Sequence, residues 1–203
     1  MKNSPTKYYL ALDVSTTCIG VALFGPKGKL SHLTHIKLDS SKDVDPNNRY
    51  IEKAKLFKKY IIEFKRMINE ELGGEVVNIF VEEPLGSSNN VNTAIMLAKF
   101  NGIVCYILNQ IYDVIPQLFT IHSIRKTFCP EFITRKVIKG ELKETLSFPK
   151  DIDKKEYIRK KVAEKEKQIE WLYGKKQNLL KENWDMSDSY AVGYHGLKIE
   201  KII

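Results

Sequence analysis

Four acidic residues stand at positions where a charge is unusual. Asp13 interrupts the apolar run YLALDV, and Glu82 ends the apolar run VNIFVE. Asp185 and Asp188 are three residues apart in WDMSDSYAVG, so on a helix they share one face. Carboxylates that meet in apolar surroundings repel one another unless a cation lies among them. Oxygen-only ligands favour Mg²⁺ or Mn²⁺, and two such ions about 3.5–4 Å apart suit in-line displacement at phosphorus.

Each acidic position also has an ordinary structural explanation. Asp13 could open the turn DVSTT through its side chain, and Glu82, with Glu83 beside it, could be a plain strand-end charge. Asp185 and Asp188 could cap a helix and interact favourably with its dipole. Three separate structural explanations, all at matching ends of strands and a helix, are less probable than a single shared site. The joint pattern therefore favours a shared site.

The elements that would position these residues follow from the hydrophobic pattern. Short β-rich runs predict strands at residues 8–12, 19–24 and 29–38, with a turn at the glycines and proline of residues 25–28. Further strands are predicted at residues 76–81 and 114–121, and the stretch 132–150 fits a loop, a hairpin or partial disorder. If the first and fourth strands are parallel neighbours, Asp13 and Glu82 emerge at the same edge of the sheet.

Four helices are predicted. Apolar residues step by three and four from Ile51 to Leu72, which predicts an amphipathic core helix. A second helix, at residues 91–111, is apolar almost all round and carries Ala94, Ala98 and Gly102 four residues apart. It is either a central buried helix or part of a subunit interface. The other two helices are predicted at residues 154–172 and 185–196.

The charge of the chain is unevenly distributed. The 203 residues fit a single domain spanning residues 1–203, and their net charge is +8. Residues 135–181 contain 15 Lys or Arg against 8 Asp or Glu and so carry nearly all of the excess. Such a basic segment is typical of proteins that bind a phosphate backbone, although a solvated lysine-rich helix has the same composition.

Other classes of site are disfavoured by composition. Cys18, Cys105 and Cys129 lie far apart without CxxC spacing, which indicates reduced thiols in a cytoplasmic compartment and excludes a zinc-finger framework. The four histidines have no metal-binding spacing. No run approaches the roughly 18–20 apolar residues of a membrane span, and the N-terminal residues lack a signal-peptide stretch, so no membrane partner is expected. Residues 15–17 are expected to shape a turn or touch a phosphate.

The acidic motifs resemble a known family. LALDVSTTCIGVALF, VNIFVEEPLG and WDMSDSYAVGYHG are similar, in order, spacing and context, to the three acidic motifs of RuvC-type Holliday-junction resolvases, most of all those carried by bacteriophages. The resemblance implies an α/β RNase H-like fold, with a five-stranded mixed sheet in the order 3-2-1-4-5 flanked by helices. It also implies a basic helical insertion at about residues 132–182.

The resemblance further implies a function. Asp13, Glu82, Asp185 and Asp188 would be catalytic ligands of two Mg²⁺ ions, which Mn²⁺ can replace, in an endonuclease that nicks branched DNA symmetrically as a homodimer. The stretch NNVNTAIMLAKFNGIV would form the helix that contributes to the dimer. DNA-binding residues are expected on the basic helix that carries Lys154, Lys155, Arg159, Lys160 and Lys161. A phage enzyme would act in the cytoplasm of its bacterial host.

Two features depart from the bacterial members, and three other functions are compatible with parts of the sequence. Leu85 stands where bacterial members have Phe, and the basic insertion is longer.

An actin-like ATPase or sugar kinase shares the motif DVSTTCIGVALF but needs a second lobe and a second phosphate loop. An RNA nuclease of the RNase H or YqgF type would use nearly the same metal chemistry and recognise the 2′-hydroxyl. A DNA-binding module without catalysis would not need intact carboxylates.

Overall fold

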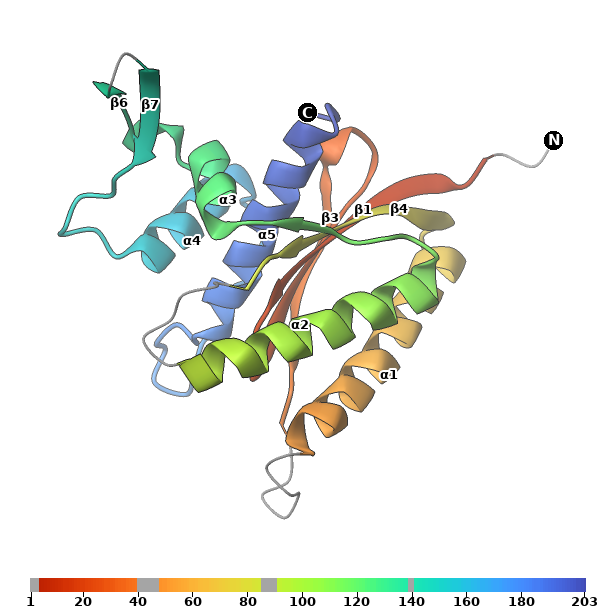
Figure 1. The fold of residues 1–203 in the computed structure, drawn as a ribbon. Helices are drawn as coiled ribbons and strands as arrows, with labels where there is room; N and C mark the ends of the chain where they lie inside the picture. Colours follow the sequence, from red (N-terminus) through yellow and green to blue (C-terminus); the bar gives the residue numbers. More distant parts are fainter. Residues whose placement is uncertain (1–3, 40–47, 85–90, 139–140) are drawn as a thin grey trace.

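A five-stranded sheet forms the centre of the protein (Figure 1). The computed structural model describes residues 4–39, 48–84, 91–138 and 141–203. The strands are β1 (Thr6–Val14), β2 (Cys18–Phe24), β3 (Leu30–Lys37), β4 (Gly74–Glu82) and β5 (Gln117–Phe119), in the order β3-β2-β1-β4-β5. β1 to β3 form an antiparallel meander, whereas β4 is parallel to both β1 and β5. The mixed sheet and the strand order implied by the resemblance are confirmed.

Helices cover both faces of this sheet (Figure 1). On one face lie α1 (Arg49–Glu70) and α2 (Val91–Tyr112). On the other lies α5 (Glu182–Ile199), together with α3 (Ile121–Phe128) and α4 (Lys154–Lys165). Side chains of β1 alternate between the two cores: Leu10 and Leu12 belong to the core under α1 and α2, whereas Tyr9 and Ala11 belong to the core under α5. This period of two decides to which face each later residue of β1 points.

The predicted amphipathic stripe of α1 is buried in its middle part, whereas Ile51 is exposed and Leu72 lies beyond the end of the helix. Its buried residues are Ala54, Phe57, Ile61, Phe64 and Ile68, and burying each large side chain stabilises the fold by about 1.5–3 kcal/mol. α2 buries only one side, which includes Phe100, Val104 and Leu108. Its outer side leaves Val91 and Tyr106 well exposed, with Gly102 in open space. α2 is therefore not a fully buried central helix.

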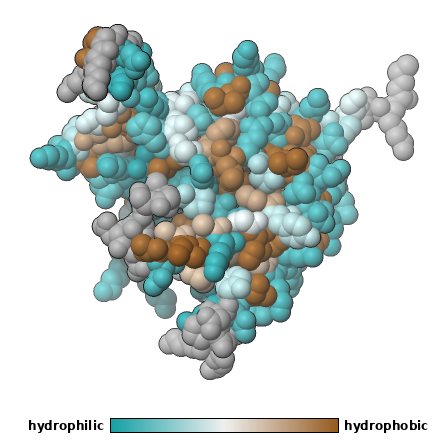
Figure 2. All heavy atoms as spheres, viewed as in Figure 1, coloured by the Kyte–Doolittle hydropathy of each residue, from teal (hydrophilic) through white to brown (hydrophobic). Residues whose placement is uncertain are grey.

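α2 is apolar along most of its length. It is long and apolar enough to cross a membrane by length and composition, and only a minor part of it is buried. The expectation that no segment meets this criterion is wrong, because the few polar residues of α2 are spread between apolar ones. Figure 2 shows a hydrophobic band over the region that α2 occupies in Figure 1. The packing of Phe100 and Val104 into the core favours a core helix with one open apolar side.

Two segments after β4 differ from the prediction. β5 is only three residues long, rather than the predicted 114–121, because Pro116 has no N–H to donate to a ladder and because Thr120 begins a helix that was not foreseen. The Thr120 hydroxyl accepts a hydrogen bond from the Ser123 backbone N–H at 3.2 Å, which caps α3. α3 therefore starts directly at the carboxyl end of β5.

The basic segment is less helical than expected. β6 (Ile133–Ile138) and β7 (Glu141–Leu146) pair as an antiparallel hairpin, one of the three structures considered for this stretch. α4 ends at Lys165 rather than at residue 172, because no apolar residue follows Val162 at a spacing of three or four. The following irregular segment is fastened to α5 by Asn183, which accepts from the Leu172 N–H at 2.8 Å and donates to the Leu172 carbonyl at 2.7 Å.

Candidate active site

The parallel pairing of β1 with β4 places two carboxylates side by side. Leu12 pairs with Val81, so Asp13 and Glu82 are the next residues of two adjacent strands at the same edge. Asp13 lies two residues after Ala11 in β1, and Glu82 lies two residues after Phe80 in β4. Ala11 and Phe80 both belong to the core under α5. Both carboxylates therefore point to the face that α5 covers.

α5 brings the other two carboxylates to this face. Asp185 is half-buried, and Asp188 is buried, in the first half of the helix. The pKa of Asp13 is raised well above its usual range, first by burial and then by the negative charges of Glu82, Asp188 and Asp185. All four predicted site residues thus lie within electrostatic reach of one another. The N-cap of α5 is Lys181, so neither aspartate caps this helix.

The burial of these carboxylates disfavours their charged forms. Burial, followed by the charge of Asp188, raises the pKa of Glu82 to about 7. Burial also raises the pKa of Asp188 to about 6, with Asp185 adding to the shift. Burial raises the pKa of Asp185 as well, although the Cys18 thiol donates a hydrogen bond that favours its charged form. The positive charges of the protein thus only partly offset the negative charges of these carboxylates.

Backbone and side-chain contacts fix the elements that carry the carboxylates. The Asn101 amide, buried on α2, donates to the Glu82 carbonyl at 3.0 Å. The next residue, Glu83, donates its N–H to the Phe119 carbonyl of β5 at 2.8 Å. At the first residue of α5, buried Glu182 forms an ion pair with Lys37 of β3 at 2.9 Å. These contacts hold the strand ends and the start of α5 in register.

Two cations approach the carboxylates, and one was not foreseen. The Lys155 ammonium lies 3.7 Å from an Asp188 oxygen, at the start of α4. Arg125, on α3, has a buried Nε with no hydrogen-bond partner among the described residues, and its charge works against the raised pKa values of Glu82 and Asp188. The only signal for Arg125 in the sequence is its place just beyond β5, at the edge where Asp13 and Glu82 emerge.

The predicted DNA-binding residues of α4 fall into two groups. Lys154, Lys155 and Lys160 are exposed. Arg159 donates to Glu156 through Nε at 2.9 Å and Nη2 at 2.7 Å, and its guanidinium lies over the Trp171 ring. Lys161 forms an ion pair with Glu131 at 2.6 Å. The last two cations are thus engaged inside the protein, whereas Lys154 and Lys160 are largely exposed and Lys155 faces Asp188.

Residues outside the acidic cluster also have defined places. The Ser15 hydroxyl donates to the Cys18 carbonyl at 2.6 Å and accepts from the Cys18 N–H at 3.1 Å, which confirms that Ser15 shapes the turn. His195 shares a 2.7 Å hydrogen bond with Thr127 and packs edge-on against Phe119. Leu85 lies outside the described residues.

The donor set fits a hard divalent cation. Within the ranges that the structure describes, no three His, Cys, Asp or Glu side chains already converge on one metal position. The four carboxylates nevertheless repel one another, and the ammonium of Lys155 lies where a cation is needed. Four carboxylates without a thiolate or imidazole ligand suit Mg²⁺ or Mn²⁺ rather than zinc.

Known structures share this fold. Thermus thermophilus RuvC aligns with a TM-score of 0.56 and 13% sequence identity, over 96% of this chain and 95% of that one. RuvC of the same organism in complex with a Holliday junction substrate aligns with a TM-score of 0.58 and 11% identity over the same shares. No protein-family model and no curated protein matches the sequence. The chain therefore has a RuvC-like, RNase H-like fold.

Metal binding should depend on pH in a direction set by these carboxylates. Because their pKa values are higher in the folded protein than the usual 3.8 to 4.5, the metal-free protein should lose stability as the pH rises from about 4 to 7. Mg²⁺ at one hundred times its dissociation constant should restore about 2.7 kcal/mol at pH 8, or a rise of roughly 5–10 °C in Tm. Near pH 5 the rise should be much smaller, as thermal melts would show.

Adjacent glutamates provide the control for this experiment. Glu82→Gln should remove most of the Mg²⁺-dependent rise in Tm at pH 8. Glu83→Gln should retain it, because Glu83 is exposed and does not contribute to the raised pKa values of the cluster. An equal rise at pH 5 and pH 8, or an equal loss in both variants, would show that Mg²⁺ binds elsewhere.

Proposed function

We propose that this protein is a divalent-metal-dependent endonuclease that cuts branched DNA, of the Holliday-junction resolvase class. The observation that carries the proposal is the meeting of Asp13, Glu82, Asp185 and Asp188 on one face of a RuvC-like sheet. The structural neighbour in complex with a Holliday junction supports branched DNA as the substrate. The basic segment beside the carboxylates supports a polyanionic substrate as well.

The four carboxylates would hold two Mg²⁺ ions, with Mn²⁺ as a substitute. When bound, such ions supply an activated water and neutralise charge on the leaving oxygen. The residues of the chain have separate roles in this proposal. The carboxylates bind and orient, whereas Lys155 and Arg125 offset the negative charge of the phosphodiester that must enter an already anionic pocket.

We assign DNA backbone contacts to Lys154, Lys155 and Lys160. They are the exposed cations of the predicted set. Asp153 accepts hydrogen bonds from the N–H groups of Lys155 and Glu156 at 2.9 and 3.1 Å, which fixes the start of α4 beside Asp188. Arg159 and Lys161 would act indirectly, by holding α4 in place.

Removing two of these lysines should weaken DNA binding and its dependence on salt. Lys154→Ala combined with Lys160→Ala should reduce the slope of log affinity against log salt concentration by about 1.8, or about 0.9 for each phosphate that is no longer neutralised. Fluorescence anisotropy with a labelled junction at several salt concentrations measures this slope. Lys58→Ala combined with Lys59→Ala, on the exposed side of α1, removes the same charge and should leave the slope near the wild-type value. Equal changes in both double variants would contradict a role for α4.

We also propose that the protein acts as a homodimer through the outer side of α2. Val91, Ile95 and Tyr106 are exposed there at 68%, 46% and 65%, and apolar side chains in such a row are typical of an interface. Gly102 meets no atom of its own chain within 4 Å of an added Cβ, so the helix surface is flat at that point. A dimer would place two acidic pockets on opposed DNA strands.

Cleavage mapping tests the function. Purified protein with Mg²⁺ should make paired, symmetric nicks in a mobile four-way junction and leave linear duplex DNA uncut. Preferential cleavage of an RNA–DNA hybrid would instead favour an RNA nuclease of the same fold. Binding of junctions without any cleavage in Mg²⁺ or Mn²⁺ would favour a DNA-binding module.

A further inference from the structure

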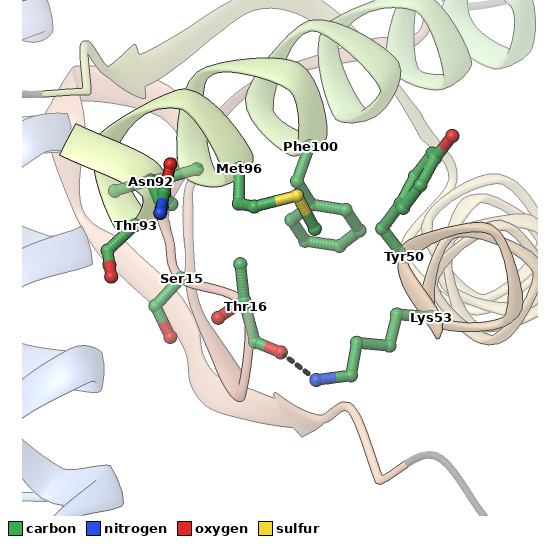
Figure 3. Close-up of a pocket in the computed structure, with 9 residues that line it drawn as sticks. Ser15, Thr16, Tyr50, Lys53, Asn92, Thr93, Met96 and Phe100 are labelled. Atoms are coloured by element: carbon green, nitrogen blue, oxygen red, sulfur yellow. Dashed lines mark hydrogen bonds between the residues drawn. The ribbon is translucent and has the colours of Figure 1, made fainter. Parts of the chain in front are cut away.

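A pocket that includes none of the four carboxylates lies between α1, α2 and the turn after β1 (Figure 3). Its volume is about 460 Å³, and it opens between the turn after β1, the first turn of α1 and the first half of α2. Tyr50 and Met96 supply its aromatic and thioether surfaces, and the fully buried Phe100 supports them from below. Such side chains provide flat, polarisable surfaces against which a planar ring can stack.

The opposite wall of the pocket is polar and cationic. The Lys53 ammonium donates to the Thr16 carbonyl at 2.5 Å, as Figure 3 shows. Burial, and then the charge of Arg49, lowers the pKa of Lys53. An ammonium has three donors, and the bond to Thr16 uses one of them. The wall thus combines donors with positive charge, whereas the acidic cluster is negative.

The pocket and the candidate active site meet at the same edge of the sheet from opposite faces, because the carboxylates point to the α5 side whereas the pocket lies on the side of α1 and α2. A smaller cavity of about 140 Å³ is lined by Glu82 and Val14 as well as by Thr93 and Leu97. Thr93 and Leu97 also line the larger pocket. Thr16 lies three residues after Asp13 in the chain. A DNA strand whose phosphate lies at the carboxylates would therefore pass the mouth of the pocket with its neighbouring nucleotide.

We propose that this pocket receives one unpaired base of the branched-DNA substrate, from a nucleotide next to the nicked phosphate. The inference rests on the proposed function and adds a specificity-determining site to it. Stacking is interrupted at a branch point, and extruding a base costs less where its stacking or pairing is already lost. Stacking on Tyr50 and Met96, with Lys53 donating to the base edge or the adjoining phosphate, fits the two chemically different walls.

Base removal tests this proposal without requiring catalysis. Junctions carrying a single abasic site at successive positions around the nick are titrated in Ca²⁺, and affinity is measured. For the wild type, one position should weaken binding by about 5- to 20-fold, as expected for loss of one stacked base. With Tyr50→Ala and Met96→Ala combined, the same abasic site should weaken binding less than about 2-fold.

Matched variants and a cross-linking experiment make the test decisive. Leu56→Ala combined with Ile62→Ala truncates two exposed side chains of α1 and should preserve the full abasic effect. If the pocket variant does not fold, 5-iodouracil at the sensitive position of the wild-type complex should cross-link to Tyr50 or Met96. The absence of any sensitive position, an undiminished effect in the pocket variant, or cross-links only to other surfaces would overturn the proposal.

The two proposals fail in different ways. If the wild type binds junctions in Ca²⁺ with one sensitive base but does not cleave them in Mg²⁺, the pocket stands and the nuclease activity fails. If the wild type nicks junctions with equal efficiency whatever base or abasic site is present, the nuclease stands and the base pocket fails.

Discussion

Asp13→Asn should abolish junction cleavage while leaving junction binding intact. Asp13 is the residue whose pKa is raised by all three other carboxylates, so it lies where their charges overlap and where a cation would be held most strongly. An amide has similar shape but no negative charge. The expected loss is on the order of a thousand-fold or more in the single-turnover rate with Mg²⁺. Affinity for a junction in Ca²⁺ should change little.

The same substitution should stabilise the metal-free protein. Removing one of several mutually repelling buried charges relieves the unfavourable free energy that the metal would otherwise offset. The Tm of Asp13→Asn without Mg²⁺ should therefore lie above that of the wild type at pH 8, and the difference should shrink near pH 5. Asp113→Asn, at the far end of α2, provides a matched control. Loss of binding, cleavage and stability together would indicate that Asp13 is structural.

The main features of the fold could be predicted because they depend on local patterns. Short apolar, β-rich runs predict β1 and β4, and the period of two in a strand carries Asp13 and Glu82 to one face of the sheet. The spacing of Asp185 and Asp188 on one helix face needs no tertiary information. Glu82 lies beside Asp13 because β1 and β4 are parallel neighbours, whereas Asp185 and Asp188 reach Asp13 because α5 packs against β1 and β2.

The parts that escaped prediction depend on partners distant in the sequence. Arg159 and Lys161 look like any other cations of a basic helix, but Lys161 pairs with Glu131, thirty residues earlier. Arg125 reaches the carboxylates only because α3 begins at Thr120 and packs against α5. Neither contact can be recognised from the periodicity of the sequence. The pocket at Tyr50 and Met96 likewise joins three segments that no local pattern connects.

The close approach of β2 to α5 leads to a second prediction with a large effect. Gly20 pairs with Asp13 across β1 and β2, and a Cβ at Gly20 would lie 1.9 Å from the Asp185 carbonyl oxygen of α5. Because that atom belongs to the backbone, no rotamer change can relieve the clash. Gly20→Ala should therefore destabilise the fold by about 2–4 kcal/mol, seen as a fall of roughly 5–15 °C in Tm.

This prediction joins stability to the active site, since relief of the clash has to separate β2 from the part of α5 that carries Asp185. The folded fraction of Gly20→Ala should thus lose both cleavage and the Mg²⁺-dependent rise in Tm. Gly102→Ala is the matched control for the stability of the single chain, because no atom of that chain lies within 4 Å of its added Cβ. In a helix interior that change should stabilise by about 0.5–1 kcal/mol. If Gly20→Ala melts like the wild type and binds Mg²⁺ normally, α5 is not seated by this close approach, and the proximity of Asp185 to Asp13 must have another cause.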